Sequence, residues 1–110
     1  MVDRRFWVAD GRQADFEAVF GREGIWRDFL KRAPGYAETD VESESPAERR
    51  YRVRDFWSWH RNFELFRERF AAEYERFERL LSTEGLIERQ QFVGAYYEEK
   101  GGDGDEFVPG

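Results

Sequence analysis

Residues 58–81 read SWHRNFELFRERFAAEYERFERLL, and this stretch decides the fold. Large apolar side chains recur in it at steps of three or four residues: Trp59, Phe63, Phe66, Phe70, Tyr74, Phe77 and Leu81. That spacing places them on one face of an α-helix, because a strand would require a step of two. Six of these seven residues are aromatic. We therefore expect this aromatic seam to lie across something broad and flat, such as a sheet.

The stretches around this helix have the composition of β-strands. They are residues 5–9, 36–43, 50–57 and 89–97, and the middle two form a hairpin through a turn at 44–48. Residues 14–20 and 25–30 have helical spacing, and we expect the first helix to be broken near Gly21–Gly24. The order β-α-β-β-α-β predicts an α+β, ferredoxin-like fold: a four-stranded antiparallel sheet with both helices on one face. We expect one domain over residues 1–99 and a disordered, glycine-rich tail over 100–110.

The bulk properties limit the classes of function. The chain has 110 residues, a formal net charge of −6 and no cysteine, which excludes disulfides and thiolate chemistry. The acidic balance makes nucleic acid an unfavourable partner. No segment has the length of a membrane span or the pattern of a signal peptide, so a cytoplasmic protein without a membrane partner is expected.

The hairpin carries alternating charges. If Asp40 faces Arg54, then Glu42 faces Arg52 and Glu44 faces Arg50, all on one face of the sheet. We expect the opposite, more apolar face to meet the helices. The charged face is then either a solvated surface with weak ion pairs or a surface buried in a dimer.

Five segments together resemble the antibiotic biosynthesis monooxygenase superfamily of dimeric α+β barrels. They are DGRQ at 10–13 with Phe16, FG at 20–21 followed by GIW at 24–26, RAPGY at 32–36, DFW at 55–57, and FRERF at 66–70 followed by Tyr74. The resemblance covers about residues 5–98. It implies a homodimer, with a mostly apolar pocket between each sheet and its helices. Members include cofactor-free oxygenases of polyketide phenols and haem-degrading enzymes.

The haem-degrading pattern fits this chain poorly. It uses an Asn on the first strand, a Trp at the end of the third strand and a His ligand on the second helix. Trp57 matches the Trp, but the first strand has no Asn, and Arg67 stands where the His is required. No phosphate-binding loop, nucleophile elbow or metal-ligand cluster occurs. An oxygenase here would therefore work without a flavin, metal or other cofactor.

Asp55 and His60 are the candidate catalytic residues. Asp55 shares the helix-facing side of its strand with Trp57, and a carboxylate there either pairs with Arg67 or Arg27 or acts as a base with a raised pKa. His60 is either a surface residue at the start of the helix or an acid/base group.

The candidate substrate-binding residues are mostly aromatic. Trp57 either packs in the core or forms a pocket wall that stacks on a flat substrate. The candidate binding residues are Trp57, Tyr51, Trp26, Phe63, Phe66 and Arg67. The predicted cavity is bordered by Trp57, Asp55, Tyr51, Phe63, Phe66 and Trp26. The leading hypothesis is a monooxygenase-like protein that binds or oxidises a flat, phenol- or quinone-type aromatic molecule. The alternative is a non-catalytic dimeric binding or accessory protein whose pocket is filled by its own side chains.

Overall fold

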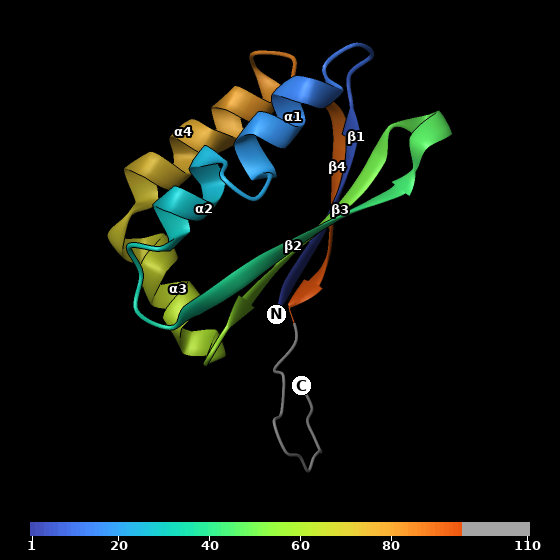
Figure 1. Ribbon diagram of the computed structural model, residues 1–110. Coiled ribbons are helices and arrows are strands. Elements are labelled where there is room, and N and C mark those ends of the chain that lie inside the picture. Colours follow the sequence, from blue (N-terminus) through green and yellow to red (C-terminus); the bar gives the residue numbers. More distant parts are fainter. Residues whose placement is uncertain (96–110) are drawn as a thin grey trace.

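The computed structural model describes residues 1–95 as a sheet with a helical layer on one side (Figure 1). The tail predicted for residues 100–110 and the end of the predicted last strand at 96–97 lie outside the described residues. The elements, in chain order, are β1 (Val2–Val8), α1 (Gln13–Phe20), α2 (Ile25–Leu30), β2 (Tyr36–Ser45), a short 3-10 turn η1 (Pro46–Glu48), β3 (Arg50–Trp57), α3 (His60–Arg69), α4 (Ala71–Ser82) and β4 (Ile87–Ala95).

The sheet has four strands in the order β2-β3-β1-β4, and every neighbouring pair is antiparallel. This arrangement confirms the predicted α+β ferredoxin-like fold. The break in the first helix is also confirmed, because α1 ends at Phe20 and α2 begins at Ile25. The β2–β3 hairpin runs beyond the helical layer (Figure 1), so its turn is covered by no helix.

The aromatic helix differs from its prediction in two ways. It is two helices, since Phe70 has φ −114° and ψ 37° and interrupts the helical backbone between α3 and α4. The hydrogen bonds from Phe70 N to Phe66 O and from Tyr74 N to Phe70 O persist at 2.9 Å, so the interruption is a bend. Trp59 is 61% exposed and is not part of the buried seam, because it precedes the first helical residue, His60.

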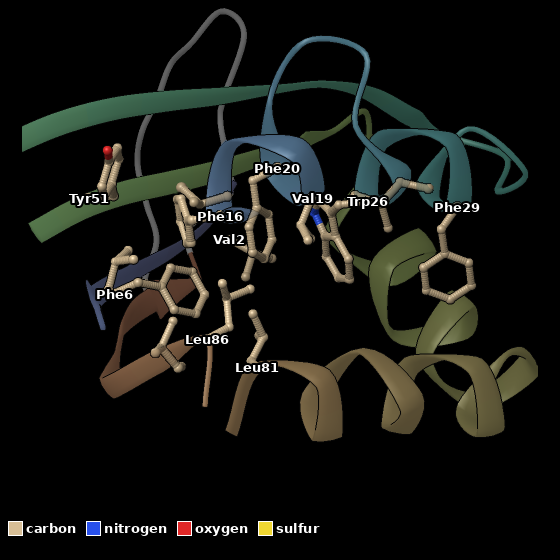
Figure 2. Close-up of a cluster of buried hydrophobic side chains, with 14 of the residues drawn as sticks. Val2, Phe6, Phe16, Val19, Phe20, Trp26, Phe29, Tyr51, Leu81 and Leu86 are labelled. Atoms are coloured by element: carbon tan, nitrogen blue, oxygen red, sulfur yellow. The ribbon is translucent and has the colours of Figure 1, made fainter. Parts of the chain in front are cut away.

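Aromatic side chains fill the space between the sheet and the helices (Figure 2). Alternate positions of β1 and β3 face the helices: Val2, Arg4, Phe6 and Val8 from β1, and Tyr51, Val53, Asp55 and Trp57 from β3. Phe63, Phe66 and Leu81 are buried beneath α3 and α4, and Phe70, Tyr74 and Phe77 pack against the same core. The seam therefore lies across the sheet, as its spacing predicted.

The face of the sheet opposite the helices, hereafter the open face, carries the charged side chains. The register places Asp40 opposite Arg54 and Glu42 opposite Arg52, as predicted. An irregularity between Ser43 and Ser45 puts Ser45, rather than Glu44, opposite Arg50. Glu44 Oε1 still lies 3.1 Å from Arg50 Nε. The predicted ion pair therefore forms, although the two residues are not directly opposite each other in the sheet.

Among residues 1–95, no helix is both long enough and apolar enough to cross a membrane.

Candidate functional site

The candidate binding residues fall into two groups in the structure. Trp57, at the end of β3, lies 5.7 Å from Phe63 and 5.5 Å from Phe66 between ring centroids. Tyr51 lies six residues earlier on the same strand, a separation of about 20 Å. There it packs against Phe16 of α1 at 4.7 Å, and its hydroxyl donates to Glu17 at 3.3 Å. The structure therefore does not bring Tyr51 to the surroundings of Trp57.

Trp57 is enclosed by other aromatic side chains. It is 6% exposed, and Tyr36 meets its ring edge-on at 5.7 Å in addition to Phe63 and Phe66. Its indole Nε1 is buried and has no hydrogen-bond partner within residues 1–95. Such packing is typical of a core residue, and Trp57 does not line the hollows described below.

Asp55 is a carboxylate in the protein interior. It is 2% exposed, and its Oδ1 accepts hydrogen bonds from Trp26 Nε1 at 3.1 Å and from Thr39 Oγ1 at 2.6 Å. Thr39 Oγ1 is in turn 2.7 Å from the hydroxyl of Tyr36. A chain of hydrogen bonds thus runs from Tyr36 through Thr39 and Asp55 to Trp26.

Burial is the main cause that raises the pKa of Asp55, because it disfavours the charged carboxylate. The positive charge of Arg4 and the bonds from Thr39 and Trp26 act in the opposite direction. Within residues 1–95 the hydrogen-bond partners of Asp55 are neutral donors, and no ion pair with Arg67 or Arg27 forms, although the charge of Arg27 also acts to lower the pKa of Asp55.

His60 begins α3 and is largely buried on its side-chain surface. Its Nε2 lies 3.3 Å from Glu64 Oε2, one helical turn later, and its ring lies 6.2 Å from Phe63. The catalytic roles of Asp55 and His60 stay predictions.

A hollow of about 620 Å³ lies between the helices and the sheet near β4, hereafter the β4 hollow. Two strands and two helices supply its lining: Val2 and Arg4 from β1, Gln90 and Phe92 from β4, Phe63 and Arg67 from α3, and Ala71, Tyr74, Glu75 and Glu78 from α4. Of the candidate residues, Phe63 and Arg67 lie here. Its volume falls in the range of pockets that hold small ligands, which is about 300–1,000 Å³.

Arg4 is the main charged group at the base of this hollow. Its side chain is 6% exposed, and Nη1 donates to Glu78 Oε2 at 3.3 Å. Its guanidinium lies over the rings of Phe6 and Trp26, at 5.0 and 5.1 Å from their centroids. Nε and Nη2 of Arg4 are buried and have no hydrogen-bond partner in the described part of the chain. Contact with aromatic faces compensates part of the cost of burying this cation.

Arg4 is not among the residues predicted from the sequence, although the sequence carries a signal for it. Arg4 occupies an even position of β1, between the apolar residues Val2 and Phe6. The same alternation singled out Asp55 on β3. Arg4 is a cation on the apolar face of β1, and Asp55 is an anion on the apolar face of the neighbouring strand β3. This combination indicates a buried polar cluster. Tyr74 is also absent from the predicted site residues, since helical spacing does not reveal which seam residues line a hollow.

Other hollows occur in the described part of the chain, and one of them, of about 510 Å³, lies on α3 at Glu64, Arg67 and Glu68. One of about 700 Å³ lies between α2 and α4 on the helical surface, where Ile25, Phe77 and Leu80 line it. One of about 380 Å³ lies near β2 and includes Arg27 and Thr39. Among residues 1–95, no group of three or more His, Asp or Glu side chains is close enough to hold a metal ion.

Comparison with solved structures supports the family resemblance. The chain is 26% identical to a protein from Bordetella bronchiseptica described as a putative antibiotic biosynthesis monooxygenase, with a TM-score of 0.62 over 90% of this chain and 95% of that one. It also shares its fold with PA3566 from Pseudomonas aeruginosa, at 14% identity and a TM-score of 0.60 over 90% of this chain and 92% of that one. No protein-family model matches the chain, and a search of curated proteins gives no match.

Proposed function

We propose that this chain is a monooxygenase-like protein that binds a flat aromatic molecule of phenol or quinone type in the β4 hollow. The chain has the ferredoxin-like fold of the antibiotic biosynthesis monooxygenase superfamily. The observation that carries the proposal is the lining of this hollow. Phe63, Tyr74 and Phe92 offer aromatic surface, and Arg4 and Arg67 add a few polar groups. Small-molecule sites generally combine these features.

The proposed reaction needs no cofactor, because an ionised phenol can supply the electrons. In the conversion of a phenol to a quinone, one oxygen atom of O₂ enters the ring and the other leaves as water. The ring loses four electrons and O₂ gains four, so the reaction balances without a further reductant. The protein would hold the ring in place and exclude water.

The site of binding can be tested with two neighbouring alanines of α4. Ala71 lines the β4 hollow, whereas Ala72 is also exposed but does not line it. Calorimetric titration with 1-naphthol should show binding to the wild type and to Ala72→Trp. Ala71→Trp should weaken binding tenfold or more, because the indole fills the hollow. Equal binding by the two variants would place the ligand elsewhere.

Catalysis can be separated from binding by oxygen uptake. With 1-naphthol and no added flavin or metal, an oxygenase consumes one O₂ for each 1,4-naphthoquinone formed. Binding without oxygen uptake would favour the alternative function, a non-catalytic binding or accessory protein. That alternative is supported by the region around Trp57, which the protein's own aromatic side chains fill.

We also propose that the protein is a homodimer that pairs through the open face of the sheet. Asp3 supports this, because its side chain is only 4% exposed although no helix covers it. Arg52 Nε donates to Asp3 Oδ1 at 2.8 Å, and Arg54 lies 3.9 Å from the same carboxylate. The open face thus carries paired charges, so a second copy can cover it without leaving these charges unpaired.

A further inference from the structure

The β4 hollow contains hydrogen-bond donors that lack acceptors. Arg67 forms no ion pair or hydrogen bond within residues 1–95. Its guanidinium lies over the rings of Phe63 and Tyr74, at 5.7 and 5.2 Å from their centroids. Nε and Nη2 of Arg4, at the base of the hollow, have no hydrogen-bond partner among the same described residues. Two cations with unused donor capacity therefore border one hollow.

Tyr74 adds a third donor. It lines the same hollow, and its hydroxyl makes no hydrogen bond within the described part of the chain. Burial is the main cause that raises the pKa of Tyr74, so the hydroxyl keeps its proton at neutral pH. A protonated phenol donates a hydrogen bond to an anion, whereas a phenolate would repel it.

The acidic side chains of the hollow are already engaged. Glu78 accepts from Arg4 through Oε2 at 3.3 Å and from Gln90 through Oε1 at 3.2 Å. Glu75 Oε1 lies 3.7 Å from Nη1 of Arg79, one turn later on α4. The carboxylates thus have partners inside the protein, and the groups left for a ligand are donors on Arg67, Tyr74 and Arg4.

We infer that the β4 hollow selects aromatic ligands that carry an oxyanion, such as a ring carboxylate or an ionised acidic phenol. This inference rests on the proposed function, since it names the substrate class of the same hollow. The rings of Phe63 and Phe92 contact the flat part of the ligand, and Arg67 and Tyr74 bind its charged oxygens. Arg4 acts from beneath as a fixed positive charge, because burial leaves it little freedom to move.

The inference can be tested with a pair of ligands of the same shape. 2-Naphthoate is an anion at pH 7, and 2-naphthamide is its neutral counterpart. Titration of the full chain should show that naphthoate binds about tenfold or more tightly, because a hydrogen bond to a charged group contributes this much affinity. The preference should shrink in 0.5 M NaCl, since Arg67 is exposed to solvent.

Three variants test which residues cause the preference for naphthoate over naphthamide. Arg67→Gln should bind both ligands about equally, because it removes the cation and keeps a polar side chain. Tyr74→Phe keeps the ring and should lower affinity for naphthoate severalfold while leaving naphthamide unchanged. Arg69→Gln is the matched control: it removes an exposed arginine of the same helix that does not line the hollow, and it should keep the wild-type preference.

The outcomes separate the inference from the proposed function. Equal binding of the two ligands by the wild type would overturn the anion preference but leave the aromatic site standing. A preference that survives Arg67→Gln and Tyr74→Phe would assign it to other residues and also overturn the inference. Failure of both ligands to bind would overturn the inference together with the proposed site.

Discussion

Trp57 lies among Tyr36, Phe63 and Phe66 and has little exposed surface. Its sequence position allowed two interpretations, because strand alternation shows which side of the sheet a residue faces but not whether space remains beside it. Packing of the rings decides that question, and it depends on where the α3–α4 bend places Phe63 and Phe66. Tyr51 differs in this respect, because its spacing of six residues from Trp57 along one predicted strand already implies a separation of about 20 Å.

We predict that Trp57→Ala lowers the free energy of unfolding by about 3–5 kcal/mol, because it leaves a large cavity among aromatic rings. Trp57→Phe should cost less, about 1–2 kcal/mol, since the indole Nε1 has no hydrogen bond to lose. Urea unfolding followed by circular dichroism measures both. A Trp57→Ala midpoint equal to that of the wild type would show that Trp57 is not part of the core.

Asp55 gives a prediction about pH. Its pKa in the folded protein is raised, so above the ordinary value of 3.8 the folded state holds a proton that the unfolded state has lost. The contribution of Asp55 to stability therefore falls as pH rises from 3.8 to the folded pKa and is constant above it.

Asp55→Asn retains an oxygen that can accept from Trp26 and Thr39 but cannot ionise. We expect the unfolding free energy of this variant, relative to the wild type, to increase as pH rises from 4 to 8. The positive charge of Arg4 acts to lower the pKa of Asp55 and therefore weakens this trend. If the variant instead loses relative stability as pH rises, the charge of Arg4 dominates and the carboxylate is ionised in the fold.

At the scale of elements, the strands and the first helix followed from local pattern. Residues 50–57 alternate without interruption, and β3 has the predicted bounds. β1 begins at Val2, three residues earlier than predicted, because pairing with both β3 and β4 extends it through residues that lack a strand pattern of their own. The bend at Phe70 was not predictable from spacing, since the aromatic period continues through it.

The turn between α1 and α2 depends on Gly24 for a reason that the sequence did not show. Its φ of −81° suits any residue, but a Cβ would lie 2.3 Å from the backbone oxygen of Val19 and 2.8 Å from that of Ala18. We predict that Gly24→Ala destabilises the protein by about 1–3 kcal/mol, because the turn must shift to admit the methyl group.

Gly11 provides a control for this substitution. It has a φ of +78° and open space where a Cβ would be. Gly11→Asn should be close to neutral, because asparagine tolerates left-handed backbone. Thermal unfolding of the two variants compares them directly, and equal midpoints would mean that the turn at Gly24 adjusts without cost.

The charged side chains of the open face come from several strands, so this face is a property of the whole molecule. Hydrogen bonds from Arg5 first, and also from Arg52 and Arg50, lower the pKa of Glu44 to about 2. Together with the pairs at Asp3 and Arg54, these bonds form one network across β1, β2 and β3. The cross-strand charges of the hairpin were visible in the sequence, but the contribution of β1 was not, because it depends on the strand order.

We predict that light scattering at micromolar concentration gives about twice the chain mass of 13.2 kDa. A two-fold interface brings the same surface together from both copies, and an internally paired surface avoids like-charge repulsion there. A mass of one chain over the whole concentration range would contradict the dimer and leave the open face in solvent.

Charge reversal tests which surface forms the interface. Arg54→Glu should weaken dimerisation by about 3–5 kcal/mol if the open face is buried, because it leaves Asp40 and Glu42 without Arg54 and places a further carboxylate near Asp3. Arg69→Glu makes the same change in charge on the exposed surface of α3 and should leave the dimer intact. A loss below about 1 kcal/mol for Arg54→Glu would place these ion pairs in solvent.

The bend at Phe70 also bears on the β4 hollow. Phe63 and Arg67 line it from α3, and Ala71, Tyr74 and Glu78 line it from α4, so each helix supplies one part of the lining. One pair of backbone angles at Phe70 sets the angle between those parts. Homologues can therefore change the width of the hollow, and hence the size of the ring that fits, by altering the bend while keeping the strands and their register unchanged.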